Sequence, residues 1–108
     1  INLLHDSEEK TRANAAGALG NLARNSDSLL DELIRRDAMG ALLQTLREDS
    51  GSSARKIALF SLGNFCMYEQ CRTILSKKGF EELMLQIGKQ CSDDKEMMKY
   101  LKRASKHY

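Results

Sequence analysis

The apolar positions of this chain repeat when the sequence is shifted by 43 residues in its first part and by 41 residues further on. Many of them are spaced by three and four residues, which is the pattern of amphipathic helices. A period of 41–43 residues suits a repeating unit of two or three helices. We therefore expect two copies of one helical unit. The matched positions are Leu3 and Leu46, Ala15 and Ala58, Leu19 and Leu62, Leu22 and Phe65, Leu33-Ile34 and Ile74-Leu75, Leu42-Leu43 and Leu83-Met84, and Leu46 and Ile87.

Each unit is predicted to contain a long, a short and a medium helix. These span 7–25, 28–36 and 38–48 in the first unit, and 53–67, 70–78 and 80–91 in the second. A turn at 49–53 joins the units. Ser7, followed by acidic residues, is the expected N-cap of the first helix, and Asp37 either ends the second helix or caps the third. Ser92-Asp93-Asp94 should cap a last helix over 95–108. The chain then divides into 1–5, the tail of a preceding medium helix, two units at 6–48 and 49–91, and 92–108, a further long helix.

Composition supports an all-α chain forming one domain of 108 residues. Strands favour β-branched and aromatic residues, yet valine is absent and only 6% of the residues are aromatic. Good helix formers dominate, and the absence of proline argues against long linkers. The three cysteines lack the close pairing of a disulfide framework, which favours a reducing compartment. The sequence shows neither a signal peptide nor an apolar run long enough to cross a bilayer.

The long helices present one apolar and one polar face. Ala15, Ala18, Leu19 and Leu22 should be core in the first, and Ala58, Leu62 and Phe65 in the second. The polar face combines Lys10, Ala13, Gly17 and Asn21; then Ser53, Lys56, Phe60 and Asn64; then Lys99, Arg103 and His107. Gly17 and Gly20 each cost a helix about 1 kcal/mol relative to alanine. Close approach of a neighbouring helix or of a ligand backbone would offset that cost.

Ala18-Leu19-Gly20-Asn21-Leu22 and Ser61-Leu62-Gly63-Asn64-Phe65 resemble the end of the long helix in the armadillo repeat. A small residue before each medium helix, Ala38 or Gly79, agrees with that family. The resemblance implies a right-handed α-α superhelix whose concave face binds an extended peptide, with the asparagines contacting the peptide backbone. An amide can do so because it both donates and accepts hydrogen bonds. The segments 8–22 and 56–72 further resemble the armadillo region of Fused-type serine/threonine kinases. That resemblance implies a cytoplasmic signalling protein associated with the cytoskeleton or cilia, of which this chain is a fragment.

The resemblance also suggests which ligands to expect. Nuclear-import armadillo proteins carry tryptophans one turn before the asparagines, where this chain has Gly17, Phe60 and Arg103, so a basic import signal is not expected. The last helix is basic: residues 95–108 sum to +4, within a chain whose net charge is only +2. This suits an acidic or phosphorylated segment, although it also suits a solvated helix end favoured by the macrodipole. The small net charge gives no indication of a nucleic-acid partner.

We therefore expect a non-catalytic binding module. Its candidate peptide-binding residues are Asn21, Asn64, Phe60, Lys56, Lys99, Arg103 and His107. No catalytic residue, metal site, cofactor or small-molecule substrate is indicated, and no membrane partner. Two alternatives stay open. One is a purely structural solenoid segment, in which the asparagines bond neighbouring backbone. The other is an enzyme, which no motif in the sequence supports. Exposed apolar surface at the ends of the stack would favour self-association.

Overall fold

The computed structural model describes residues 2–49 and 51–108, and every regular element in this part of the chain is helical. A short 3₁₀ helix, η1, is followed by seven α-helices. Because no strand occurs in the described residues, the expected all-α helical-repeat fold is confirmed. The elements are η1 (Asn2–His5), α1 (Glu9–Asn25), α2 (Asp27–Arg35), α3 (Ala38–Glu48), α4 (Ser52–Phe65), α5 (Glu69–Lys77), α6 (Phe80–Gln90) and α7 (Lys95–His107).

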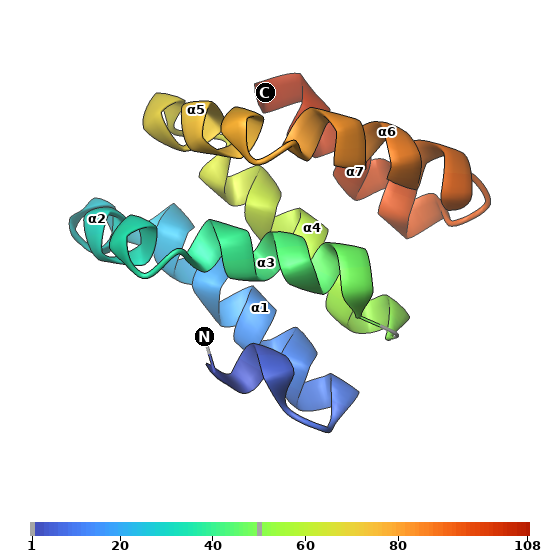
Figure 1. Ribbon diagram of the computed structural model, residues 1–108, viewed down its shortest axis with the longest axis horizontal. Coiled ribbons are helices and arrows are strands. Elements are labelled where there is room, and N and C mark those ends of the chain that lie inside the picture. The colour runs from blue at the N-terminus through green and yellow to red at the C-terminus, as the bar shows by residue number, and fades with distance from the viewer. Residues whose placement is uncertain (1, 50) are drawn as a thin grey trace.

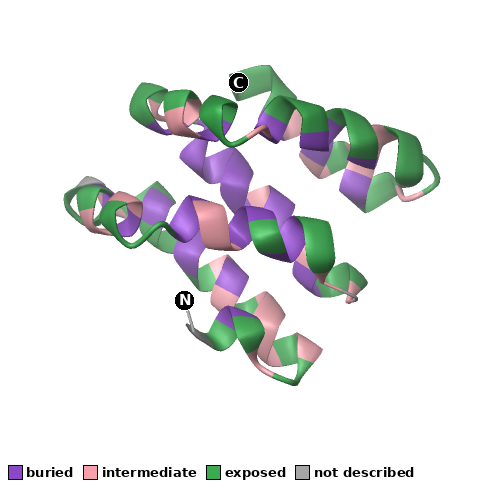
Figure 2. Cartoon of the chain, viewed as in Figure 1, coloured by how far each residue is buried: buried purple, intermediate pink, exposed green. Residues whose placement is uncertain are grey.

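The helices form two layers (Figure 1). The long helices α1, α4 and α7 make one layer, in which α4 packs between α1 and α7, and the medium helices α3 and α6 make the other. Helix α4 is consequently the most buried element (Figure 2), with every residue from Ser61 to Cys66 buried. Its repeat partner α1 is half solvent-exposed because the described chain covers it on fewer sides.

The medium helices are built on the same apolar spacing. In α3 the buried residues Leu42, Leu43 and Leu46 follow Met39 by three, four and seven residues. In α6 the buried residues Leu83, Met84 and Ile87 follow Phe80 by the same intervals. This spacing puts all four side chains on one face of a helix. Both faces pack into a common core with the long helices, so the two medium helices use the same spacing to reach that core.

Each medium helix begins after one residue in the left-handed region. Asp37 has φ 56° and its side chain accepts a hydrogen bond from the Gly40 nitrogen at 3.2 Å. Gly79 has φ 80°, a conformation that glycine adopts without the Cβ clash that other residues meet. Asp37 therefore caps the third helix.

Other helix ends agree with the sequence only in part. The predicted cap of the last helix is confirmed at Asp94, whose carboxylate accepts from the Met97 nitrogen at 3.1 Å. The predicted Ser7 cap is wrong: α1 begins at Glu9 without a side-chain cap, and Asp6 accepts from the Glu8 nitrogen at 2.9 Å instead. Ile1, in the predicted tail 1–5, and Ser50, in the predicted turn 49–53, lie outside the described residues.

The predicted core was correct for α4 and partly wrong for α1. Ala58, Leu62 and Phe65 are fully buried, and Leu19 is buried. Ala18 and Leu22 are exposed, however, and Ala16 and Ala23 are buried in their place. The reason is positional. The face of α4 equivalent to Ala18 lies against α1, whereas no described helix covers that face of α1. The match of Leu3 with Leu46 was also wrong, because Leu3 is exposed and Leu4 is the buried residue.

Candidate functional site

The candidate site is built on the contact between α1 and α4, which are unusually close. A Cβ atom placed on Gly20 would lie 2.9 Å from the Cα atom of Ser61, nearer than non-bonded atoms approach. Gly17 is less constrained, since its Cβ would lie 3.4 Å from Ile57. Of the two glycines noted in the sequence, Gly20 is the one that must lack a side chain, because α4 lies so close to it.

This closeness lets side chains of the second unit reach backbone oxygens of α1. Ser61 donates to the Ala16 carbonyl at 2.7 Å, Asn64 to the Gly20 carbonyl at 3.2 Å, and the Tyr68 hydroxyl to the Ala23 carbonyl at 2.7 Å. The three acceptors lie four and three residues apart, on one side of α1. A row of three side-chain donors thus joins the two units.

Asn64 is fully buried, and both ends of its amide are bonded within the chain. While Nδ2 donates to Gly20, Oδ1 accepts from Nη2 of Arg103 at 2.5 Å. One asparagine therefore connects α1, α4 and α7. In this arrangement a bound peptide can pair with the amide only where Arg103 is displaced.

Arg103 lies across α4 and covers the candidate residues there. Its Nη1 donates to the Phe60 carbonyl at 3.3 Å, and its guanidinium carbon is 4.6 Å from the centroid of the Phe60 ring. Phe60 also meets Tyr100 edge to face, with the centroids 5.3 Å apart. The structure therefore brings Asn64, Phe60 and Arg103 together into one cluster, which we call the α4–α7 cluster.

Lys56 is half-buried and paired rather than available. Its Nζ lies 3.2 Å from Asp94 and 3.7 Å from Glu96, both at the start of α7. The hydrogen bond to Asp94 raises the pKa of Lys56, and the backbone N–H of Met97 together with Lys56 lowers the pKa of Asp94. This lysine thus fixes the first turn of α7 against α4.

The remaining candidates are exposed and lie elsewhere. Asn21 sits on the open side of α1, one helix away from Asn64. Lys99 and His107 are on α7, where they line a shallow hollow of about 650 Å³ with Lys102 and Lys106, and Arg103 borders the same hollow. The seven candidates therefore fall into three groups: the α4–α7 cluster with Lys56 beside it, Asn21 on α1, and the basic surface of α7.

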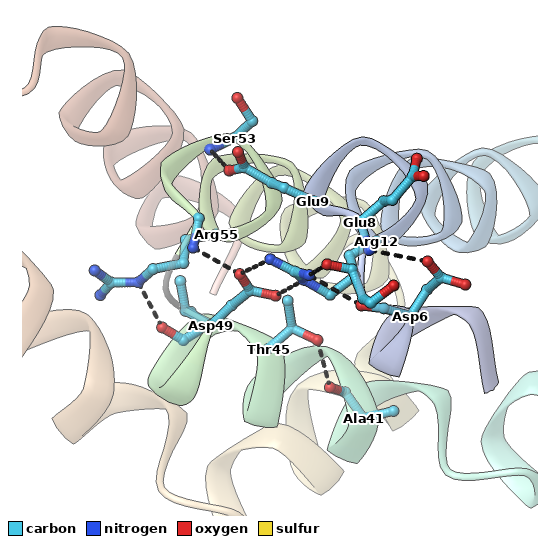
Figure 3. A network of polar contacts seen from close by, with 12 residues as sticks. Asp6, Glu8, Glu9, Arg12, Ala41, Thr45, Asp49, Ser53 and Arg55 are labelled. Carbon is cyan, nitrogen blue, oxygen red and sulfur yellow. Dashed lines mark hydrogen bonds and ion pairs between the residues drawn. The ribbon is translucent and has the colours of Figure 1, made fainter.

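A second polar network lies at the opposite end of the long helices and serves to hold the first unit together (Figure 3). Arg12 bonds both carboxylate oxygens of Asp49, at 2.7 and 3.1 Å, and also the carbonyls of Asp6 and Ser7. Burial raises the pKa of Asp49, but the bonds from Arg12 and Gly51 outweigh it and lower that pKa overall. The Asp49 side chain is only 5% exposed and both of its carboxylate oxygens accept hydrogen bonds from Arg12, so this network ties the chain that follows η1 and α3 to α1.

Two of the three thiols lie in the core of the fold. Cys66 and Cys71 are buried, and burial raises their pKa values to about 12 and about 11. A thiol held protonated is a poor nucleophile and a poor metal ligand. Within residues 2–49 and 51–108, no three of the histidine, cysteine and acidic side chains converge on a possible metal position. None of the helices in the described part of the chain is long and apolar enough to span a membrane.

Reasoning from the sequence did not identify Ser61 or Tyr68 as links between the units. The signal was weak, because their equivalents in α1 are Ala18 and Asn25, so no repeated motif marks them. Only the close approach at Gly20 makes their role visible. That approach was indicated in the sequence by a glycine inside a helix.

Fold and site together define an all-α helical-repeat protein. Comparison with known proteins agrees. The chain is 41% identical over 78 residues to the serine/threonine-protein kinase TIO of Arabidopsis thaliana, covering 60% of this chain and 6% of the kinase. It is 36% identical over 66 residues to importin subunit alpha-6 of the same plant, covering 61% of this chain and 12% of the importin. Both similarities are consistent with armadillo-like repeats. No family model and no solved structure matches the chain.

Proposed function

We propose that this chain is a non-catalytic protein-binding module that holds an extended segment along the layer formed by α1, α4 and α7. The observation that carries the proposal is the α4–α7 cluster, in which an amide, an aromatic ring and a guanidinium lie within bonding distance on adjacent long helices. These three groups can together pair with a peptide backbone, pack against a side chain and bind an acid.

Arg103 sets the chemistry of the expected ligand. A carboxylate or phosphate on the ligand would bond the guanidinium more strongly than the neutral oxygen of Asn64 does, because charge-assisted bonds are the stronger kind. Drawing Arg103 outward would free the Asn64 oxygen for a backbone N–H of the same ligand. Lys99 and His107 are exposed on the same helix and would add to the attraction. We therefore expect an acidic or phosphorylated segment.

A parent protein kinase of the Fused type is the second part of the proposal. It is supported by the 41% identity to a plant serine/threonine-protein kinase. The chain spans 6% and 12% of the lengths of the curated relatives that it matches, so the parent's activity and partners are inferences. In such a parent, a cytoplasmic and cytoskeleton-associated signalling protein, the module would dock partners or position the kinase.

One observation favours the alternative function, a purely structural solenoid segment. The amide of Asn64 is completely used inside the chain, donating to Gly20 and accepting from Arg103. In this case the asparagine exists to join repeats, and partners or further copies bind at the ends or on the convex face.

Affinity capture from cell lysate, read out by mass spectrometry, separates the two functions. The variants are Asn21→Ala, Asn64→Ala and the double mutant, each checked for helicity by circular dichroism. Gln44→Ala, which removes an exposed amide from α3 in the other layer, is the control. Partners that are lost with Asn21→Ala and the double mutant but kept with Gln44→Ala would support binding along the long helices. A partner list unchanged in the folded double mutant would reject it.

A further inference from the structure

A second surface, away from the α4–α7 cluster, lies between α6 and α7. There a hollow of about 510 Å³ is formed by an apolar group together with the polar residues Glu81, Lys89 and Ser105. Leu85 is 68% exposed, the highest value among the large apolar side chains of the described residues. An isolated exposed leucine is ordinary, but this one belongs to a continuous apolar groove. The apolar members of the group are Met84, Leu85, Gly88 and Leu101.

The equivalent edge of the first unit carries different side chains and different contacts. Leu62, the counterpart of the exposed Ser105, is fully buried. Arg47, the counterpart of Gly88, donates to the Lys78 carbonyl at 3.0 Å, which holds α3 against the turn between α5 and α6. The second unit therefore meets this edge of the first at Leu62 and Arg47, whereas Gln44, the counterpart of Leu85, is exposed and polar. No described element covers the same edge of the second unit.

The neighbouring face of α7 is basic and unpaired. Lys99, Lys102 and Lys106 recur at three, four and seven positions on one exposed face, and none forms an ion pair among the described residues. They line the basic hollow described above, which shares Ser105 with the apolar groove. The apolar groove and the row of lysines therefore form one continuous surface.

The lysines also exclude one occupant. Lys102 occupies the position of Ala16 in α1 and of Leu59 in α4, both fully buried, and Lys106 occupies the position of Gly20 and Gly63. In α1 and α4 these small or apolar residues admit the next long helix. A fourth long helix packed the same way would bury lysine ammonium groups at a large desolvation cost. The exposed face of α7 is therefore cationic where the equivalent faces of α1 and α4 are small or apolar, and it does not suit a long helix packed in the same way.

From this combination we infer that the α6–α7 groove is a docking site for an amphipathic helix of another protein, with leucine-like residues on one face and acidic residues along one flank. The apolar face would lie over Leu85 and Gly88, as helices bind in hydrophobic grooves. The acidic flank would meet Lys102 and Lys106. A bare polyanion would leave the apolar floor uncovered, and a wholly apolar partner would leave the lysines unmatched. This inference does not depend on the proposed function of the long-helix layer.

The test uses a labelled helical peptide of about 20 residues, long enough to form a stable helix, with leucines on one face and glutamates on one flank. Fluorescence anisotropy measures its binding to the wild-type chain, to Leu85→Gln and to Lys102→Glu/Lys106→Glu. Met67→Gln, at a 52% exposed apolar position on another surface, is the matched control. A peptide with lysine in place of every glutamate tests the charge requirement. Because all substituted side chains are exposed, the variants should keep wild-type helicity, which circular dichroism checks.

We expect each groove variant to weaken binding about tenfold or more, as loss of one interface anchor does. Met67→Gln should leave binding unchanged, and the lysine peptide should not bind. Binding should weaken as salt is raised. Equal binding of both peptides, or of all variants, would overturn the inference. The inference would also be overturned if binding depended on Lys102 and Lys106 but not on Leu85, and if anionic vesicles or oligonucleotides bound the chain as tightly as the peptide does. Sedimentation analysis tests whether a second copy of the chain fills the groove. A dimer that Leu85→Gln dissociates and the peptide does not would assign the groove to that second copy and overturn the inference.

Discussion

At position 64 a single side chain links three helices. Its amide donates to Gly20 on α1 and accepts from Arg103 on α7, while the residue itself belongs to α4. The equivalent Asn21 is exposed and has none of these contacts among the described residues. The same residue type therefore has two environments within one chain, and the two positions should respond differently to the same substitution.

We expect Asn64→Ala to lower the free energy of unfolding by about 1–3 kcal/mol, because Arg103 and the Gly20 carbonyl lose a buried partner. Asn21→Ala, at an exposed site, should change it by no more than about 0.5 kcal/mol. Urea denaturation followed by circular dichroism measures both. Equal effects would contradict the role of Asn64 as a link between helices.

The two glycines of α1 should respond to alanine with opposite signs. Gly20→Ala places a methyl group against the backbone of Ser61, so we expect destabilisation of about 1–3 kcal/mol despite the better helix propensity. Gly17→Ala meets only ordinary contact with Ile57 and should stabilise by up to about 1 kcal/mol. Thermal denaturation of the two variants beside wild type decides this. If Gly20→Ala raised the melting temperature, the close approach of α1 and α4 would not be a constraint.

At the scale of elements, the joints between helices depend on a few charged residues. Arg12 and Asp49 connect η1, α1 and α3, and Lys56 connects α4 to the first turn of α7. Asp49, the partner of Arg12, and Asp94, the partner of Lys56, both have lowered pKa values in the folded chain. Their contribution should therefore depend on pH in a defined direction.

An aspartate whose folded pKa lies below its unfolded value of about 3.9 stabilises the fold above that pH. This contribution is lost as pH falls through the folded pKa. We expect the urea midpoint of the wild type to fall between pH 7 and pH 3. In Asp49→Asn the starting midpoint should be lower and the fall smaller, because asparagine does not titrate. An identical fall in variant and wild type would show that Asp49 does not contribute.

How far the sequence revealed this architecture differs from element to element. The sequence predicted both ends of α3 and the core residues of α4 correctly. It could do so because apolar residues spaced by three and four positions form one helix face whatever packs against it. Asn21 and Asn64 look alike in sequence and differ in burial, because burial depends on which helix lies alongside. The reach of Arg103 across α4 involves residues 39 and 43 positions away, and no local pattern encodes it. Local spacing thus determined the elements, and contacts between repeats determined the state of the site.

At the scale of the whole molecule, the stack has a closed middle and two dissimilar ends. The middle holds α4 and the buried thiols Cys66 and Cys71. One end presents the exposed residues Ala18 and Asn21 of α1, and the other presents the groove and lysines of α6 and α7. In stacked repeats, stability is the sum of unit and interface terms, so the middle should open last.

Thiol labelling with a disulfide reagent can follow that opening. The half-buried Cys91 should react first in the native chain, whereas Cys66 and Cys71, buried and with raised pKa values, should react only when α4 and α5 separate. Mass spectrometry over time should show one modification and then two more together. Adding urea should speed the later step far more than the first. Simultaneous modification of all three thiols in native buffer would contradict an ordered middle.

The row of donors at Ser61, Asn64 and Tyr68 restricts how the length of such a chain can change during evolution. Each reaches a carbonyl of α1, at Ala16, Gly20 and Ala23. Inserting one residue within α4 would turn every later side chain by about 100°, so the donors beyond it would point away from their acceptors together. Insertions and deletions are therefore not tolerable between Ser61 and Asn64, whereas the loop that follows α4 can change in length. The chain itself differs in length beyond α4: its self-similarity holds at 43 residues through Phe65 and at 41 residues from Ile74 onward, so the two-residue difference comes after Ser61 and Asn64.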